Sequence, residues 1–295
     1  MVQSTVNPAR SYLVCATPRS GSTLLCHLLD GTGVAGHPQE YFEALRHSGV
    51  PRKPHEYFDA DRHANIIERL AFREMPDGTP HTPHPLWTPE TYDRYLAWAI
   101  EQGTTPNGVF GAKLMWGYLG DFAELLRGID GMDGLTVPQL LERSFPGLRY
   151  VQITRCDKVR QAVSLWKAVQ TQAWRRDAAA DGDDARPAPR PIFSFRAINY
   201  LVRLLTAHDA SWDAYFLGLG IEPLKVTYEE LAQSPEPVVR RVLEHLEIAV
   251  PADLALPAPR LEAQADGLSE DWVRRVHEHL AALEEPTVVG SPAAS

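Results

Sequence analysis

Residues 11–25 constrain the fold more than any other stretch of this chain. The apolar run SYLVCA at 11–16 is short and is followed by turn residues, which is typical of a buried strand. Pro18 and Gly21 interrupt it, and four leucines within 22–29 mark one face of a helix. A strand, a tight glycine-containing turn and a helix N-terminus in this order predict an α/β protein with an anion-binding site at the turn.

Short apolar runs continue to alternate with amphipathic segments along the chain. Further strands are predicted at 109–115, 148–154 and 224–227, apolar as in a parallel sheet that is covered on both faces. Helices are predicted at 89–102, 159–169, 195–217, 235–247 and 269–283. This alternation predicts an α/β fold with a doubly wound central parallel sheet flanked by helices.

The length of 295 residues fits one large α/β domain or two small ones, and we predict a single domain over 1–295. Within it, segment 177–191 has too few apolar side chains to pack, so we expect a mobile loop there. No apolar run reaches the roughly 18–20 residues that a membrane span requires. The first residues include no apolar signal segment, which favours a cytoplasmic protein.

Charge and cysteine content exclude other classes of protein. The formal net charge of −9 argues against a general nucleic-acid surface, which would need a basic face. It does not argue against a small anionic ligand, because local donors decide binding in a pocket. Cys15, Cys26 and Cys156 are too scattered for a disulfide framework or a metal site.

The turn after the first strand offers every kind of group that binds a phosphate or sulfate. Backbone N–H groups of Ser20 to Thr23 converge at a helix N-terminus, where the helix dipole favours negative charge. Gly21 lets the backbone approach the ligand closely, Ser22 and Thr23 add hydroxyl donors, and Arg19 adds a cation. These residues are therefore the candidate anion loop.

Three other phosphate chemistries fail on spacing. A nucleoside-triphosphate hydrolase needs G-x-x-x-x-G-K-[ST], whereas here the basic residue precedes the glycine. A dinucleotide-binding fold needs G-x-G-x-x-G, and Gly21 stands alone. A cysteine-based phosphatase has its arginine six residues after the cysteine, where this chain has Gly21 after Cys15.

Five segments, in order along the chain, carry a resemblance to a known group. They are TPRSGSTLL at 17–25, GHPQEYF at 36–42, TPNGVFGAKLMW at 105–116, YVQITRCDKVRQAVSLWKAVQTQAW at 150–174 and LEAQADGLSEDWV at 261–273. The first and fourth resemble the 5′-phosphosulfate loop and the 3′-phosphate motif of sulfotransferases that use 3′-phosphoadenosine 5′-phosphosulfate (PAPS). Together the five resemble the bacterial trehalose 2-sulfotransferase family.

The resemblance implies a role for several residues. Arg155 and Ser164 would hold the 3′-phosphate of the donor, and Glu40 would be the general base that takes the proton of an acceptor hydroxyl. Glu43 is a neighbouring carboxylate that composition alone does not exclude. The resemblance further implies PAPS as the sulfuryl donor and a homodimer. No metal is expected, because cations and N–H donors already hold the leaving group.

Lys113 lies in an otherwise apolar predicted strand, which is unusual for a charged residue without an anionic partner. Lys113 and Arg19 are therefore expected to stabilise charge on the sulfuryl oxygens, although a structural ion pair at Lys113 is equally compatible with the sequence.

The acceptor remains open at this stage. His37 directly precedes Pro38 where relatives have an acidic residue, and together with Glu40 and Lys113 it is a candidate for contacting the acceptor. One alternative is therefore a sulfotransferase acting on a lipid or secondary-metabolite hydroxyl instead of a sugar. Another is a non-catalytic nucleotide- or sugar-binding protein. The combination of Glu40 with two cations speaks against the latter, because binding alone needs no base.

Overall fold

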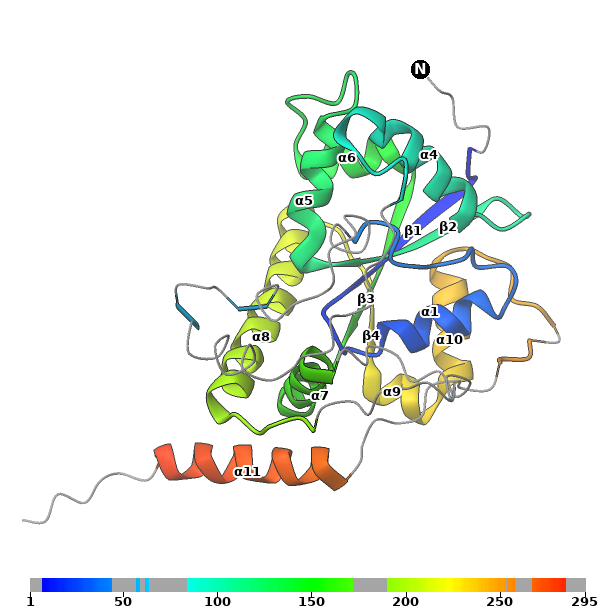
Figure 1. The fold of residues 1–295 in the computed structure, drawn as a ribbon. Coiled ribbons are helices and arrows are strands. Elements are labelled where there is room, and N and C mark those ends of the chain that lie inside the picture. Colours follow the sequence, from blue (N-terminus) through cyan, green and yellow to red (C-terminus); the bar gives the residue numbers. More distant parts are fainter. Residues whose placement is uncertain are drawn as a thin grey trace, which may run out of the picture.

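The computed structural model describes residues 7–43, 57–58, 62–63, 84–171, 190–252, 254–257 and 267–284. These residues form a four-stranded parallel sheet in the order β2-β1-β3-β4, with helices on both sides (Figure 1). The strands are β1 (Arg10–Ala16), β2 (Val109–Met115), β3 (Leu148–Thr154) and β4 (Leu224–Thr227). The expected parallel α/β sheet is confirmed.

Helices occupy most of the remaining described chain. They are α1 (Ser22–Asp30), η2 (Pro89–Thr91), α4 (Tyr92–Gly103), α5 (Trp116–Arg127), α6 (Val137–Ser144), α7 (Lys158–Thr171), α8 (Phe195–Leu219), α9 (Tyr228–Gln233), α10 (Pro235–His245) and α11 (Gly267–Glu284). Figure 1 shows α1 and α10 on one side of the sheet and α5 and α8 on the other. The helix after β3 is α7, which packs against α8 and so lies across the sheet from α1. Connections that leave β1 and β3 toward opposite faces open a crevice at the carboxyl ends of the strands in such sheets.

Differences from the sequence-based expectation are local. The helix predicted from residue 89 begins as the short 3₁₀ turn η2 before α4. Helices α5, α6 and α9 were not predicted. Segment 177–191, expected to be mobile, lies outside the described residues except for its last two positions.

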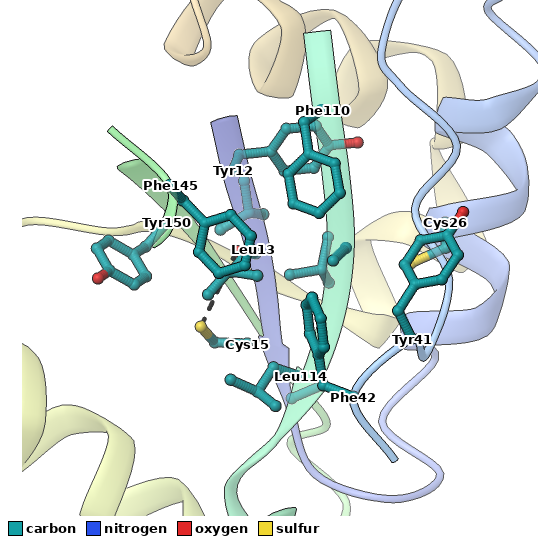
Figure 2. Close-up of a cluster of buried hydrophobic side chains, with 14 of the residues drawn as sticks. Tyr12, Leu13, Cys15, Cys26, Tyr41, Phe42, Phe110, Leu114, Phe145 and Tyr150 are labelled. Carbon is teal, nitrogen blue, oxygen red and sulfur yellow. Dashed lines mark hydrogen bonds between the residues drawn. The ribbon is translucent and has the colours of Figure 1, made fainter. Parts of the chain in front are cut away.

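The core is built around β1, whose residues from Ser11 to Ala16 are all buried. Figure 2 shows aromatic side chains gathered beside β1 and β2. Phe110 stacks on Phe145 at 5.2 Å between ring centroids, and Phe42 stacks on Phe122 at 4.2 Å. Such pairs add to the stability gained from buried area. Because Phe42 is held in this core, the segment that precedes it is fixed relative to β2.

The described helices include none that is long and apolar enough to span a membrane.

Candidate active site

The loop between β1 and α1 has the form of a tight turn. The N–H of Ser20 donates to the carbonyl of Thr17 at 3.3 Å, with Pro18 second in the turn and Arg19 third. Arg19 has φ of 64°, as the third position of a type II turn requires. A left-handed conformation costs a non-glycine residue about 1–2 kcal/mol. The fold therefore holds a strained arginine at this position.

Gly21 follows with φ of 87° and precedes the first turn of α1. Within this helix the first turn includes no acidic residue and no side chain caps its N-terminus. The hydroxyl oxygen of Ser20 is buried and finds no hydrogen-bond partner among the described residues. Uncapped N–H groups, a buried hydroxyl and the helix dipole all favour an anion at this point.

On the β3 side of the loop, Arg155 directly follows the strand. Its Nε is buried and has no hydrogen-bond partner in the described part of the chain. Its guanidinium lies over the ring of Tyr228, 4.5 Å from the centroid. The same ring packs against Gly21, where a Cβ would come within 2.6 Å of Tyr228 Cδ2. Arg155 is therefore brought to the loop through this tyrosine.

Arg19 also extends to the β3 side. Its Nε donates to the hydroxyl of Ser164 on α7 at 3.0 Å. Arg19 and Ser164, which the sequence analysis assigned to different ends of the donor, are thus in direct contact.

On the β2 side, Lys113 contacts both the loop and Glu40. Lys113 is only 3% exposed, and its Nζ donates to the Thr23 hydroxyl at 3.1 Å and lies 3.4 Å from Glu40 Oε2. Backbone pairing creates this contact, because the Lys113 N–H donates to the Gln39 carbonyl at 2.9 Å. The structure therefore places the candidate base, a buried cation and the helix N-terminus together.

Glu43 and His37, the other two titratable candidates, differ from Glu40 in exposure and in contacts. Glu43 is 2% exposed, so its carboxylate is less accessible to a substrate than that of Glu40, whose side chain is 13% exposed. His37 Nδ1 is 2.6 Å from Asp30 Oδ1, at the last residue of α1. The helix rises about 1.5 Å per residue, so this contact lies roughly 12 Å from the loop. The imidazole of His37 therefore contacts the C-terminal end of α1, and its contact with the acceptor stays a prediction.

A cavity of about 310 Å³ opens beside the loop. Pro18 and Met115 line it next to the anion site, and Tyr118, Tyr200 and His208 line it from α5 and α8. Burial lowers the pKa of His208 below its ordinary 6.5, which favours the neutral imidazole at neutral pH. No group of three His, Cys, Asp or Glu side chains in the described ranges is placed to hold a metal ion.

A parallel α/β sheet with an uncapped helix N-terminus, nearby arginines and a lysine–carboxylate pair is suited to an enzyme that acts on an anionic group. The family model for Stf0 sulphotransferase matches residues 11–279. The chain belongs to this family and is a sulfotransferase.

Two curated relatives are similar over nearly their whole length. The trehalose 2-sulfotransferase of Mycobacterium tuberculosis is 35% identical over 294 residues, covering 94% of this chain and 98% of the relative. That of Mycolicibacterium smegmatis is 37% identical over 271 residues, covering 90% and 93%. A solved sulfotransferase from Alicyclobacillus acidocaldarius is 15% identical over 95% of each chain, with a TM-score of 0.44.

Sequence reasoning missed four side chains that pack around the loop. Tyr228, Lys158, Gln161 and Asp209 all contact the loop or Arg155, yet lie in three different helices. The only signal in the sequence was Thr17, at the start of the loop motif, whose hydroxyl needs a partner once it is buried.

Proposed function

We propose that this sulfotransferase transfers a sulfuryl group from PAPS to a hydroxyl of a carbohydrate, with trehalose the first acceptor to test. The contact of Lys113 with both Glu40 and Thr23 is the observation that carries the proposal. With Glu40 as the base, this contact would hold a proton acceptor beside the proposed anion site, as hydroxyl sulfation requires. The names of the two curated relatives support a sugar acceptor.

The residues around the loop fit both phosphates of the donor. Backbone N–H groups from Ser20 to Thr23 would bind the 5′-phosphosulfate. Arg155 and Ser164 would bind the 3′-phosphate. The Nε of Arg155, which has no hydrogen-bond partner among the described residues, is a donor suited to a phosphate oxygen. Because Arg19 contacts Ser164, we assign its guanidinium to this end as well, and leave Lys113 as the cation at the sulfuryl oxygens.

In the proposed step the acceptor oxygen forms a bond to sulfur while the bond from sulfur to the bridging phosphate oxygen breaks. Glu40 takes the hydroxyl proton, and the electron pair of the broken bond leaves with the phosphate. Lys113 stabilises the negative charge that shifts between the sulfuryl and phosphate oxygens. Protein groups thus supply each charge that the step requires, and the proposal includes no metal.

The assignment of the base is tested by replacing Glu40 with glutamine. Loss of a general base lowers turnover by about 10²–10⁴-fold, and we expect Glu40→Gln to fall in this range while the product nucleotide binds as before. Glu43→Gln is the matched control, since it removes the neighbouring carboxylate and should retain turnover if it folds. Turnover of Glu40→Gln within threefold of the wild type would overturn the assignment.

The donor is tested by calorimetry. We expect 3′-phosphoadenosine 5′-phosphate to bind and ATP and NAD not to bind at comparable concentration. Equal binding of all three would contradict a site built for phosphates at both the 3′ and 5′ positions.

The cavity favours a second candidate acceptor. Its described walls are mostly apolar and aromatic, with Leu204 and Phe58 beside Tyr118 and Tyr200. Aromatic rings stack on sugar faces, but apolar walls also suit a lipid or secondary metabolite that carries a hydroxyl. A screen with ³⁵S-labelled donor against trehalose, other sugars and apolar alcohols separates the two, and exclusive labelling of apolar alcohols would refute the carbohydrate assignment.

We propose three further features, the first two from the sequence itself and the third from the family resemblance. They are a single catalytic domain over the whole chain, a cytoplasmic location and a homodimer. The family match over 11–279 supports the first. Cell fractionation tests the second, and sedimentation equilibrium tests the third, for which a monomer at all concentrations would be the contrary result.

A further inference from the structure

Two buried and two partly buried side chains form a hydrogen-bonded cluster beside the anion loop. The Thr17 hydroxyl donates to Asp209 Oδ1 at 3.0 Å. Gln161 Nε2 donates to the Thr17 hydroxyl at 3.0 Å and to the Pro18 carbonyl at 2.7 Å. Lys158 completes the group, with its Nζ 2.5 Å from Asp209 Oδ2. We refer to Thr17, Lys158, Gln161 and Asp209 as the Asp209 cluster.

The ammonium of Lys158 has three acceptors, two in this cluster and one in the backbone of Arg155. Besides Asp209, it donates to Gln161 Oε1 at 3.1 Å and to the Arg155 carbonyl at 2.5 Å. An ammonium has three N–H donors, and the three acceptors account for all of them. Lys158 is therefore a structural cation here, with no donor left over for a ligand.

The cluster joins two segments that the sheet itself does not connect. β1 and β3 are paired, but their last paired residues are Ala16 and Ile153. Beyond that point Thr17 and Pro18 lead into the anion loop, while Arg155 belongs to the 3′-phosphate segment. Asp209 on α8 binds the first segment through Thr17, and binds the second through Lys158 and the carbonyl of Arg155.

Burial makes this connection rigid. Thr17 and Gln161 are fully buried, and the side chains of Asp209 and Lys158 are 13% and 21% exposed. Breaking one bond would leave a buried polar or charged group without its partner, which is strongly unfavourable. The cluster also holds the Pro18 carbonyl directly before the strained Arg19, and strained residues persist only where their surroundings fix them.

We propose that Asp209 is a positioning residue that sets the spacing between the 5′-phosphosulfate loop and the 3′-phosphate segment. The enzyme thereby selects a nucleotide that carries phosphates at both positions. This inference rests on the proposed PAPS donor. It assigns to Asp209 no contact with the ligand, because its two oxygens are already held by Thr17 and Lys158.

The test compares a bisphosphate with its two monophosphates. In Asp209→Asn the amide oxygen can still accept from Thr17, but the charge opposite Lys158 is lost. We expect the Kd of 3′-phosphoadenosine 5′-phosphate to rise about tenfold, which corresponds to about 1.4 kcal/mol. The Kd values of adenosine 5′-phosphate and adenosine 3′-phosphate should change less than threefold, because each segment alone keeps its own donors.

Asp213→Asn is the matched control. Asp213 lies one turn further along α8 and likewise accepts from an amide, Gln152, and from a lysine, Lys225, but its side chain is 51% exposed. It has no contact with either phosphate segment in the described structure, and its replacement should leave all three Kd values unchanged. If Asp209→Asn does not fold, Thr17→Val and its hydroxyl-retaining counterpart Thr17→Ser test the same connection.

The outcomes are distinct. A merely structural role would lower the melting temperature of Asp209→Asn but leave the ratio of bisphosphate to monophosphate affinity unchanged, and that result would overturn the inference. If the PAPS assignment itself is wrong, the wild-type protein will bind 3′-phosphoadenosine 5′-phosphate no more tightly than ATP. A wild-type ratio of bisphosphate to monophosphate affinity in Thr17→Ser, together with a reduced ratio in Thr17→Val, would support the positioning role of the Asp209 cluster.

Discussion

Gly21 provides the most direct test of how the anion loop is built, because a single methyl group meets two obstacles there. Its φ of 87° is left-handed, which costs a non-glycine residue about 1–2 kcal/mol. A Cβ would also lie 2.6 Å from Tyr228 Cδ2, where ordinary contact begins at 3.4 Å. Relieving an overpacked contact of this kind costs about 1–3 kcal/mol. We expect Gly21→Ala to lose about 2–5 kcal/mol of unfolding free energy from the two effects together.

Gly33→Ala separates the two costs. Gly33 has φ of 69°, and a Cβ there would meet nothing within 4 Å. It should therefore lose only the conformational part, about 1–2 kcal/mol. The stabilisation that alanine gains by restricting the unfolded chain is shared by both variants and cancels in the comparison. The measurement is urea denaturation of both variants at equal protein concentration.

Donor binding provides the second readout of Gly21→Ala. The ring of Tyr228 would have to shift to make room for the new methyl group. Because the guanidinium of Arg155 packs on this ring, the shift would also displace Arg155. We expect the affinity for 3′-phosphoadenosine 5′-phosphate to fall at least tenfold in Gly21→Ala and to be unchanged in Gly33→Ala. Equal unfolding free energies and equal affinities in the two variants would refute this account of the loop.

Three other predictions concern protonation and strain. Burial lowers the pKa of His208 from 6.5, so the unfolded chain takes up this proton at higher pH than the folded one. Stability should therefore fall as the pH drops below about 6.5, and His208→Gln should reduce that fall in denaturation at about pH 7.5 and 5.5. Burial and Glu229 raise the pKa of exposed Cys156 above 9.0, so labelling by a thiol reagent at neutral pH should be slow and should accelerate in Glu229→Gln. Arg19→Gly should relieve about 1 kcal/mol of strain while weakening donor binding, whereas Glu247→Gly, at the other described non-glycine residue with positive φ, should leave binding unchanged.

Much of the fold follows from the local pattern of the sequence. Strands β2, β3 and β4 begin and end at the predicted residues, because each is a short apolar run between turn residues. Helix α5 was missed because Gly117 and Gly120 look like chain breaks. Tertiary packing overrides that weak preference, since Tyr118 and Phe122 of α5 are buried in the core.

The candidate site was predictable where its residues share a motif, and only there. Residues 19–23 lie together because they are consecutive, and Lys113 was recognised because a charged side chain is rare in a buried strand. Nothing in the local sequence singles out Asp209, because it lies on a long amphipathic helix where an acidic residue is ordinary. Its role depends on the packing of α8 against the end of β1, which no local pattern encodes. His37 was chosen for its closeness to Glu40 in sequence; its imidazole contacts Asp30 of α1, and its role toward the acceptor stays a prediction.

In the proposed mechanism, the order of the strands separates donor binding from proton transfer. β1 lies between β2 and β3, so its loop has one neighbour on each side. The β3 side contributes Arg155 and Ser164, while the β2 side contributes Lys113 and, through backbone pairing, Glu40. Changes on the β3 side should therefore raise the Kd of the donor nucleotide, and changes to Glu40 should lower kcat with little effect on that Kd. A single variant at Glu40 that weakened nucleotide binding as much as it slowed turnover would show that the two sides are not independent, and the division of roles proposed for the loop would have to be abandoned.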